Sequence, residues 1–248
     1  MTFPLAAQNI TIRRAARVIV QNVQLEFKAA EVAAIIGANG AGKSTLLAAL
    51  AGLRELQPLD GSVWLEGTDM RGLSKGAIAA KLAFLPAHSS VPFPLSVHEL
   101  ILLAEPSEGA FVEAVAAMEL EDLIEKPITQ LSTGEAKRAW LAMTLARVTP
   151  ILLLDEPLAG LDPRYQMRLL ETLQTRAEAG ACVVFIAHDI PYAARANRVI
   201  ALSEARVVAD GTPLEVLNVD LLRQLFGVEV WIGTDTSGTI VPLPTRAV

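Results

Sequence analysis

The sequence has a single cysteine, Cys182, and no apolar run long enough to cross a membrane. The cysteine falls inside an apparent core strand, which favours a reducing cytoplasm over an oxidising compartment. Runs such as VAAII and ILLLDE are far shorter than the roughly 20 residues that a spanning helix needs. The first residues, MTFPLAAQNITIRRAAR, contain neither a charged leader nor an apolar segment of signal-peptide length. We therefore expect a cytoplasmic protein that does not span a membrane by itself.

Clusters of positive charge are also lacking. Lysine and arginine number 21 against 27 Asp and Glu, the net charge is −6, and basic residues occur as scattered singles or pairs. Because nucleic acids are bound largely through clustered positive charge, this composition argues against a nucleic-acid partner. Hydrophobic residues, by contrast, make up 52% of the chain, and its mean hydropathy is +0.41. The chain can bury a large core, as one large domain or as a domain with an inserted lobe.

A glycine-rich segment, GANGAGKST at 37–45, follows a predicted buried strand at 32–36. A helix is predicted directly after it, over 46–53, with Gly52 at its end. The segment fits the pattern G-x-x-x-x-G-K-[ST], in which glycines let backbone N–H groups turn toward phosphate oxygens at the start of a helix. A glycine turn with a chance lysine is the alternative, and the flanking strand and helix argue against it.

The residue types in this loop suit a nucleoside triphosphate with its magnesium ion. Lys43 would reach the β- and γ-phosphates, and the Ser44 hydroxyl would ligate Mg²⁺. The candidate nucleotide-binding residues of the loop are Gly37, Asn39, Gly40, Gly42, Lys43, Ser44 and Thr45.

Two acids close a wholly apolar strand at 150–157, PILLLDEP. Such a strand is typical of the centre of a parallel sheet, whose carboxyl edge faces a ligand crevice. Asp155 is placed there to hold the same Mg²⁺ as Ser44, and Glu156 to polarise a water for attack on the γ-phosphate. Two acids that merely solvate a loop are the alternative, which the presence of a phosphate loop disfavours.

A helix is predicted to begin in the stretch LSTGEAKRAW at 131–140. Its amino terminus is polar and rich in small residues, like the end of the phosphate loop. Ser132 and Glu135 form the pattern S-x-x-E of a capping box, worth about 1 kcal/mol. A cap does not explain Gly134, which is a poor residue for a first helical turn and suggests that another molecule approaches the backbone closely. Because the phosphate loop already accommodates a whole triphosphate, this second anion site is predicted to serve another nucleotide.

Five motifs, GANGAGKST, LSTGE, ILLLDEP, AGLD and FIAHD, resemble in order and spacing those of the nucleotide-binding subunits of ATP-binding cassette transporters. The likeness runs from about residue 8 to about residue 230, and SSVPFPLSVHELI resembles the importers for haem, ferric siderophores and cobalamin. The family implies an α/β fold, with a P-loop NTPase core and a mostly parallel sheet. It also implies an N-terminal antiparallel β subdomain and a helical subdomain inserted at about 86–140. We expect the ATP-binding domain to cover 1–236, followed by a frayed tail at 237–248.

The resemblance also implies roles for residues outside the phosphate loop. Ser132 and Gly134 would contact the γ-phosphate of ATP held by a second copy of the chain, so that two copies close head to tail around two ATPs. Thr133 stands where the family usually has glycine. Asp162 resembles the residue that links the two active sites, and it also suits an N-cap before Pro163. The implied catalytic residues are Glu156, His188 and Lys43, and the implied ligands of Mg²⁺ are Ser44 and Asp155.

Other positions raise alternatives or depart from the family pattern. His188 falls where the family has a histidine that contacts the γ-phosphate, although a lone histidine at a strand end is often incidental. The segment TIRRAAR has no aromatic residue where the family stacks one on adenine, so Arg14 would have to lay its guanidinium on the base. Ala87 replaces a glutamine that touches Mg²⁺ or the attacking water, and His88 or water would have to complete the site. We therefore predict slower or less tightly coupled hydrolysis.

The remaining elements follow from periodicity and turn residues. Helices are predicted at 96–105 and 110–125, and these form the smaller lobe. After His188 we expect a strand near 197–202, a turn in EARVVADGTP at 204–213 with Asp210-Gly211, and a capped helix from Thr212-Pro213.

The implied partners are a second copy of the chain, two transmembrane permease subunits and, indirectly, a periplasmic binding protein. The chain would lie peripherally on the cytoplasmic face of the inner membrane. The family docks its permease near 84–100, where Val91, Phe93 and Leu95 would either contact it or pack the lobe. One alternative is a soluble ATPase acting on nucleic acid or ribosomes, which the acidic balance opposes. Another is a regulatory subunit that binds ATP without cleaving it. The absence of the family's glutamine at Ala87 is consistent with this alternative.

Overall fold

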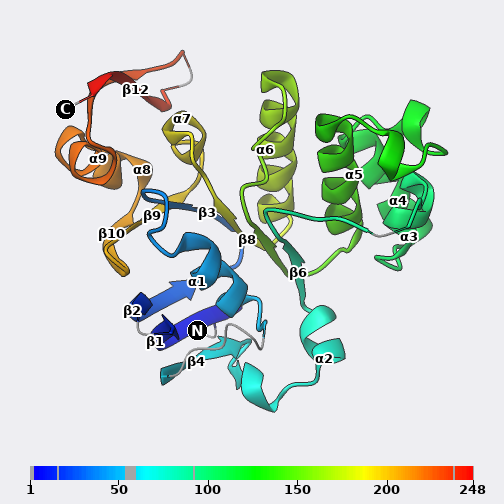
Figure 1. Cartoon of the computed structure of the whole chain (residues 1–248), viewed down its shortest axis with the longest axis horizontal. Coiled ribbons are helices and arrows are strands. Elements are labelled where there is room, and N and C mark those ends of the chain that lie inside the picture. The colour runs from blue at the N-terminus through cyan, green and yellow to red at the C-terminus, as the bar shows by residue number, and fades with distance from the viewer. Residues whose placement is uncertain (1–2, 16, 54–59, 92, 237, 248) are drawn as a thin grey trace.

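The computed structural model describes residues 3–15, 17–53, 60–91, 93–236 and 238–247. Its centre is a six-stranded sheet in the order β10-β9-β3-β8-β7-β6, in which all strands but β10 run parallel (Figure 1). The predicted mostly parallel core is thereby confirmed. The strands are β3 (Glu31–Ile36), β6 (Leu82–Leu85), β7 (Ile151–Leu154), β8 (Cys182–Ile186), β9 (Arg198–Ser203) and β10 (Arg206–Gly211).

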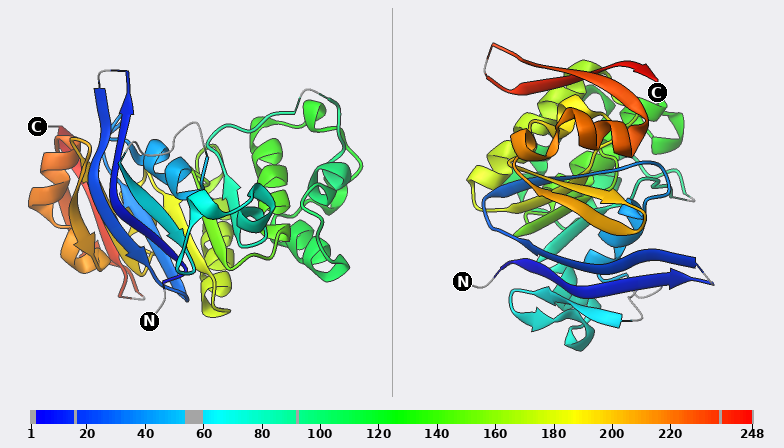
Figure 2. Two further views of the ribbon diagram at one scale, coloured as in Figure 1. Left: turned by 90° about the horizontal axis from the view of Figure 1, so that it is seen from below. Right: turned by 90° about the vertical axis from the view of Figure 1, so that its left-hand side faces the viewer.

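A second, antiparallel sheet has the order β2-β1-β4-β5 and confirms the predicted N-terminal subdomain. Helix α1 (Lys43–Leu50) lies between the two sheets, where its leucines are buried against both (Figures 1 and 2). The helix ends as predicted, because Gly52 follows its last turn with a φ of 73°. The strands of this sheet are β1 (Leu5–Arg14), β2 (Arg17–Phe27), β4 (Asp60–Leu65) and β5 (Thr68–Asp69).

The core sheet is covered on both faces, which explains why its strands are almost wholly apolar. In β3, Ala33 and Ile35 belong to the cluster that contains α1. Val32, Ala34 and Ile36 belong to the opposite cluster, under α6 (Pro163–Glu178). With both faces filled, the loops at the carboxyl ends of the parallel strands are left to carry a binding site.

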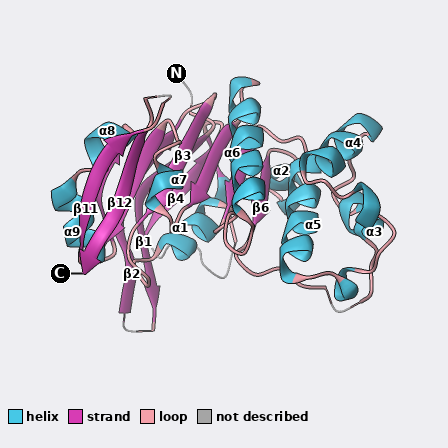
Figure 3. Ribbon diagram, turned by 90° about the horizontal axis from the view of Figure 1, so that it is seen from above, coloured by secondary structure: helices cyan, strands magenta, loops and turns pink. Residues whose placement is uncertain are grey.

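The predicted helical lobe lies beyond β6 and α6 at one end of the molecule (Figures 1 and 3). Its first two helices are shorter than predicted, because Glu105 and Glu119 take left-handed φ values of 50° and 49° that end each helix. The lobe consists of α3 (Val97–Leu102), α4 (Glu108–Ala117), α5 (Thr133–Ala146) and 3₁₀ turns at 121–123 and 128–130. Between β5 and β6 the chain forms a 3₁₀ turn, Met70–Gly72, and α2 (Lys75–Ala79).

The turn predicted in 204–213 is present at the start of that segment, but its placement at Asp210-Gly211 is wrong. Both residues belong to β10 and pair with β9, opposite Ile200 and Val199. The chain reverses earlier, at Glu204 and Ala205, whose φ values are 47° and 65°. Two consecutive left-handed residues form the kind of tight hairpin turn that usually uses glycine or asparagine, so the residue types at 204–205 do not indicate it.

The expectation of a frayed tail is also wrong. Strand β12 (Ile240–Ala247) pairs antiparallel with β11 (Val228–Thr234), and Val230 and Ile240 are buried. The end positions of the predicted tail, 237 and 248, lie outside the described residues. The hairpin follows α7 (Ile190–Ala193), α8 (Pro213–Val216) and α9 (Val219–Phe226), and Thr212 caps α8 as predicted, in a capping box with Glu215.

Candidate nucleotide-binding and catalytic site

The phosphate loop connects β3, at the centre of the sheet, with α1. Gly42 caps α1 with a left-handed φ of 101°, and a Cβ there would clash with the carbonyl oxygen of Ile19. A Cβ at Gly37 would likewise clash with the carbonyl oxygen of Leu202. Both glycines are therefore required by this chain's own backbone, whatever the loop binds.

Lys43 is held inside the loop rather than in solvent. Its side chain is 5% exposed, and its Nζ donates to the carbonyl oxygens of Gly37 at 2.8 Å and Ala38 at 3.1 Å. Burial lowers the pKa of Lys43, while the charges of Glu156 and Asp155 oppose that shift. A buried ammonium group is stabilised by a nearby anion, so the loop is built to receive one.

Ser44, on α1, and Asp155, which follows β7, are joined by a side-chain hydrogen bond. The Ser44 hydroxyl donates to Oδ1 of Asp155 at 3.1 Å, and Asp155 is only 4% exposed. Burial raises the pKa of Asp155, although the Ser44 hydrogen bond and the charges of Lys137 and Lys43 act in the opposite direction. Adjacent oxygen ligands of an octahedral Mg²⁺ lie about 2.9 Å apart, so this oxygen pair fits two neighbouring positions on the ion.

Among the described residues no group of three or more His, Cys, Asp or Glu is arranged to hold a metal. A magnesium ion at Ser44 and Asp155 therefore has to complete its shell with water and phosphate oxygens, which is the usual pattern for Mg²⁺.

Glu156 and His188 form the second pair of the site. Oε1 of Glu156 lies 2.6 Å from Nε2 of His188, and the two side chains are 30% and 39% exposed. Glu156 has a φ of 50°, a left-handed conformation that costs a residue with a Cβ free energy and that clusters at functional sites. The turn after β7 thus aims the carboxylate at the residue that follows β8, leaving both groups open to a ligand.

A depression of about 290 Å³ brings the predicted residues together. Glu156 and His188 line it with Asn39, Gly40, Gly42, Lys43, Ser44 and Thr45. Gly37 and Asp155 stand behind this lining and reach it through their hydrogen bonds to Lys43 and Ser44.

Arg14, Arg17 and Ile19 also line the depression, and of these only Arg14 was singled out from the sequence. No aromatic side chain is among the lining residues, in keeping with the absence noted in the sequence. Ala87 is half-buried and His88 is exposed, and neither lines the depression.

Ser132 caps α5 as predicted. Its Oγ accepts from the N–H of Glu135 at 3.3 Å, and Oε2 of Glu135 accepts from the N–H of Ser132 at 2.8 Å. A Cβ at Gly134 would lie 3.4 Å from the carbonyl oxygen of Gly160, which is ordinary van der Waals contact. The chain itself therefore has room for alanine at Gly134, and nothing within it explains the glycine.

Asp162 occupies the N-cap of α6 with Pro163 after it, as predicted, but its side chain makes no capping hydrogen bond. Ser132 and Asp162 are exposed, and neither they nor Gly134 line the depression of their own chain. The structure thus divides the predicted site residues into two groups, one around the phosphate loop and one at the starts of α5 and α6.

One feature of the site was not predicted. Lys137 on α5 is half-buried, and burial lowers its pKa against the opposing charges of Asp155 and Glu156. No motif marks Lys137, because its proximity to the two acids depends on how α5 packs against the end of β7.

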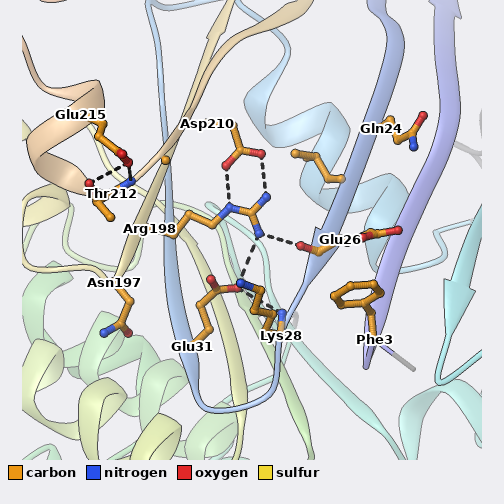
Figure 4. Close-up of a pocket in the computed structure, with 12 residues that line it drawn as sticks. Phe3, Gln24, Glu26, Lys28, Glu31, Asn197, Arg198, Asp210, Thr212 and Glu215 are labelled. Carbon is orange, nitrogen blue, oxygen red and sulfur yellow. Dashed lines mark hydrogen bonds and ion pairs between the residues drawn. The ribbon is translucent and has the colours of Figure 1, made fainter. Parts of the chain in front are cut away.

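A larger cavity, of about 630 Å³, lies at the opposite edge of the sheet (Figure 4). Its central group is Arg198, which donates to both oxygens of Asp210 at 2.5 and 2.6 Å and to the carbonyl oxygen of Glu26 at 2.6 Å. Glu31 is a further neighbour at 3.6 Å. These hydrogen bonds satisfy the guanidinium of Arg198 from within the chain. The smaller depression at the phosphate loop is therefore the better candidate for the functional site.

The fold and the loop geometry together define a P-loop nucleoside triphosphatase: a buried strand, a glycine loop, a helix, and acids at the end of a neighbouring parallel strand. The family description "ABC transporter" matches residues 20–159. "Hemin import ATP-binding protein HmuV" of Rhodopseudomonas palustris is 39% identical over 243 residues, which cover 92% of this chain and 90% of that protein. "Ferric enterobactin transport ATP-binding protein FepC" of Escherichia coli is 33% identical, covering 98% of this chain and 95% of that protein.

Among solved structures, the dimeric MJ0796, a bacterial ABC transporter cassette, matches with a TM-score of 0.76 and 26% identity, covering 84% of this chain and 98% of that one. The chain belongs to the ABC transporter family, and its nucleotide is accordingly ATP. No helix in the described part of the chain is both long and apolar enough to cross a membrane.

Proposed function

We propose that this chain is the ATP-hydrolysing subunit of an importer for haem, a ferric siderophore or cobalamin. The observation that carries the hydrolytic part is the 2.6 Å contact between Glu156 and His188, in the depression that also holds Lys43 and Ser44. A subunit that only bound ATP would not need an acid strained into position beside the γ-phosphate end of the loop.

Each residue has a distinct role in this proposal. Lys43 neutralises charge on the β- and γ-phosphates, and Glu156 accepts a hydrogen bond from the attacking water and orients it. His188 contacts the γ-phosphate and, through its bond to Glu156, keeps that carboxylate in place. Ser44 and Asp155 would hold Mg²⁺, which neutralises phosphate charge when bound.

The second group of residues is proposed to act on a second copy of the chain. Ser132, Gly134 and Asp162 lie outside their own depression, and the space at Gly134 is not used by this chain. A helix amino terminus favours an anion, so the start of α5 suits the γ-phosphate held by the partner. The dimeric structure of the cassette MJ0796 supports pairing of two copies, and the head-to-tail arrangement is part of the proposal.

The relatives' names support the importer and its cargo, since they describe haem and ferric enterobactin transport. We propose that two permease subunits dock on the lobe, so that the chain lies peripherally on the cytoplasmic face of the inner membrane, with a periplasmic binding protein acting indirectly. Val91 and Leu95 pack partly against the core, whereas Phe93 is 58% exposed. Phe93 is therefore the apolar side chain of this segment that is free to contact a permease.

Hydrolysis and dimerisation are tested together with Glu156→Gln. We expect turnover to fall at least about 100-fold, because the base is lost, while MgATP still binds and now traps a dimer. Phosphate release and size-exclusion chromatography with light scattering measure the two effects. The control is Glu105→Gln, another acid with a left-handed φ, here 50°, which lies in the lobe. Full turnover in the Glu156 variant, or a strictly monomeric trapped protein, would sink the proposal.

The transport role is tested by co-purification. The tagged chain should retain a permease from membranes, and cargo-loaded binding protein should stimulate ATP hydrolysis by the assembled complex. Retention of RNA or ribosomes in place of a permease would instead support the soluble alternative.

A further inference from the structure

The carboxyl end of α4 is held by side chains from two other helices. The last carbonyl groups of a helix have no partner within it, and cations near them are favourable. Here those carbonyls accept from arginines rather than from water alone. Arg168 on α6 donates to Ala116 and Ala117, each at 2.8 Å, and Arg138 on α5 donates to Met118 at 2.6 Å and Glu119 at 2.7 Å.

The carboxylate of Glu119 completes this arrangement. Its Oε1 accepts from Arg164 at 2.5 Å and from Arg168 at 2.6 Å. The guanidinium of Arg138, which is 7% exposed, lies 4.2 Å from the ring centroid of Tyr165 on α6. We name this cluster the α4 socket; it consists of residues 116–119 with Arg138, Arg164, Tyr165 and Arg168.

Glu119 is an unusual residue for its position. It follows the cap of α4 with a φ of 49°, its N–H bonds to Ala116 at 3.3 Å, and the N–H of Leu120 bonds to Val115 at 3.1 Å. Glycine is the usual residue at this point of such a helix end, because a Cβ is strained there. The strain is tolerated where the side chain has a use, and in this chain the use is to hold Arg164 and Arg168.

The socket joins α5 and α6 close to their amino ends. Arg138 lies six residues after Ser132, which is about 9 Å along a helix, and Arg164 lies two residues after Asp162. Figure 1 shows α5 standing between α6 and α4. By tying the carboxyl end of α4 to both helices, the socket fixes the spacing between the two helix starts that carry Ser132 and Asp162.

We propose that the α4 socket positions these two helix starts for closure on the second copy's nucleotide, and that Glu119 is its positioning residue. The inference rests on the proposed head-to-tail dimer, in which both starts must reach the partner at once. Glu119 itself touches no nucleotide, so it acts only through the helices that it connects.

The test uses Glu119→Gly in the Glu156→Gln background with MgATP. Glycine keeps the backbone carbonyls of the socket and relieves the strain at φ 49°, but removes the carboxylate. Because lost ion pairs and relieved strain oppose each other, we expect the melting temperature to change by less than about 3 °C. The dissociation constant of the trapped dimer should rise at least about fivefold, because each of the two subunits must then restore the spacing of its helix starts before the dimer can close, at a total cost of about 1 kcal/mol. MgATP binding to the monomer should stay unchanged.

Two further variants separate charge from strain. Glu66→Gly is the matched control, because Glu66 also has a left-handed φ, 48°, and forms an ion pair with Lys81, but it lies between β4 and β5. It should leave the dimer unaffected. Glu119→Gln keeps the strain and loses the charge, so it should weaken the dimer as much as glycine does.

If the Glu156→Gln background protein dimerises, and both Glu119 variants made in it dimerise as tightly as Glu66→Gly, then the α4 socket has no positioning role. If the parent itself stays monomeric, the proposed dimer fails, and this inference fails with it.

Discussion

Gly134 offers a test in which stability and function should move in opposite directions. It is the second residue of α5, and a Cβ there would lie 3.4 Å from the carbonyl oxygen of Gly160, which the free chain accommodates. Alanine is favoured over glycine in helices by about 0.5–1 kcal/mol. For a domain of this size, Gly134→Ala should therefore raise the melting temperature by about 1–3 °C.

The same methyl group should weaken the ATP-bound dimer. If the backbone of the partner's nucleotide site closes against Gly134, an added methyl group overpacks the contact, which typically costs about 1–3 kcal/mol. Because the proposed dimer contains two such contacts, the total cost is about 2–6 kcal/mol, which corresponds to a dissociation constant raised by about 30-fold or more. Sedimentation of the Glu156→Gln background with saturating MgATP measures this constant, and thermal unfolding of the nucleotide-free protein measures the gain in stability.

Gly109 supplies the matched control for this prediction. It is the second residue of α4, and a Cβ there would meet nothing within 4 Å. Gly109→Ala should give a similar rise in melting temperature and leave the dimer unchanged. The reasoning about the second copy is refuted if Gly134→Ala dimerises as tightly as Gly109→Ala. A fall in melting temperature would instead contradict the account of the helix.

Two other substitutions probe the chemistry of the site. Asp155→Asn should raise the melting temperature of the nucleotide-free protein at neutral pH and remove the extra stabilisation that Mg²⁺ gives to the ATP complex. Burial raises the pKa of Asp155 in the folded state above its value in the unfolded chain, so the ionised carboxylate destabilises the fold at neutral pH. Below about pH 4 the carboxyl group is protonated in both states, and the rise in melting temperature on Asp155→Asn should vanish there in thermal scans. Ala87→Gln should raise the rate of phosphate release about two- to tenfold. The glutamine amide would add one hydrogen bond to the attacking water, and the net free energy of one hydrogen bond corresponds to about this factor. Unchanged basal and transport-stimulated rates would contradict the role assigned to position 87.

Most of the fold was predictable because its signals are local. The apolar strands at β3, β7 and β8 and the caps at Ser132 and Thr212 follow from short patterns. The failures have two physical causes. Glu119, Glu204 and Ala205 all take left-handed φ values that their residue types do not indicate. Strand β12 contains Pro242 and Pro244, which argue against a strand, so its hairpin with β11 was missed.

The candidate site divides in the same way. The phosphate-loop residues and the acids after β7 were placed by motif, and the structure brings them together with His188. Lys137 and the lining residue Arg17 were missed, because each becomes part of the site only through packing between elements. What Arg14 contacts in the nucleotide complex remains a prediction.

The order of the strands has a consequence for how this chemistry tolerates sequence change. Lys43, His188 and Glu156 follow three adjacent strands, β3, β8 and β7, and neighbouring strands are separated by about 4.8 Å in the direction of their hydrogen bonds. Main-chain bonding, rather than any particular side chain, sets the width of the depression that these three groups line. Volume-conserving replacements inside the strands should therefore leave that width intact, which fits a TM-score of 0.76 at only 26% identity.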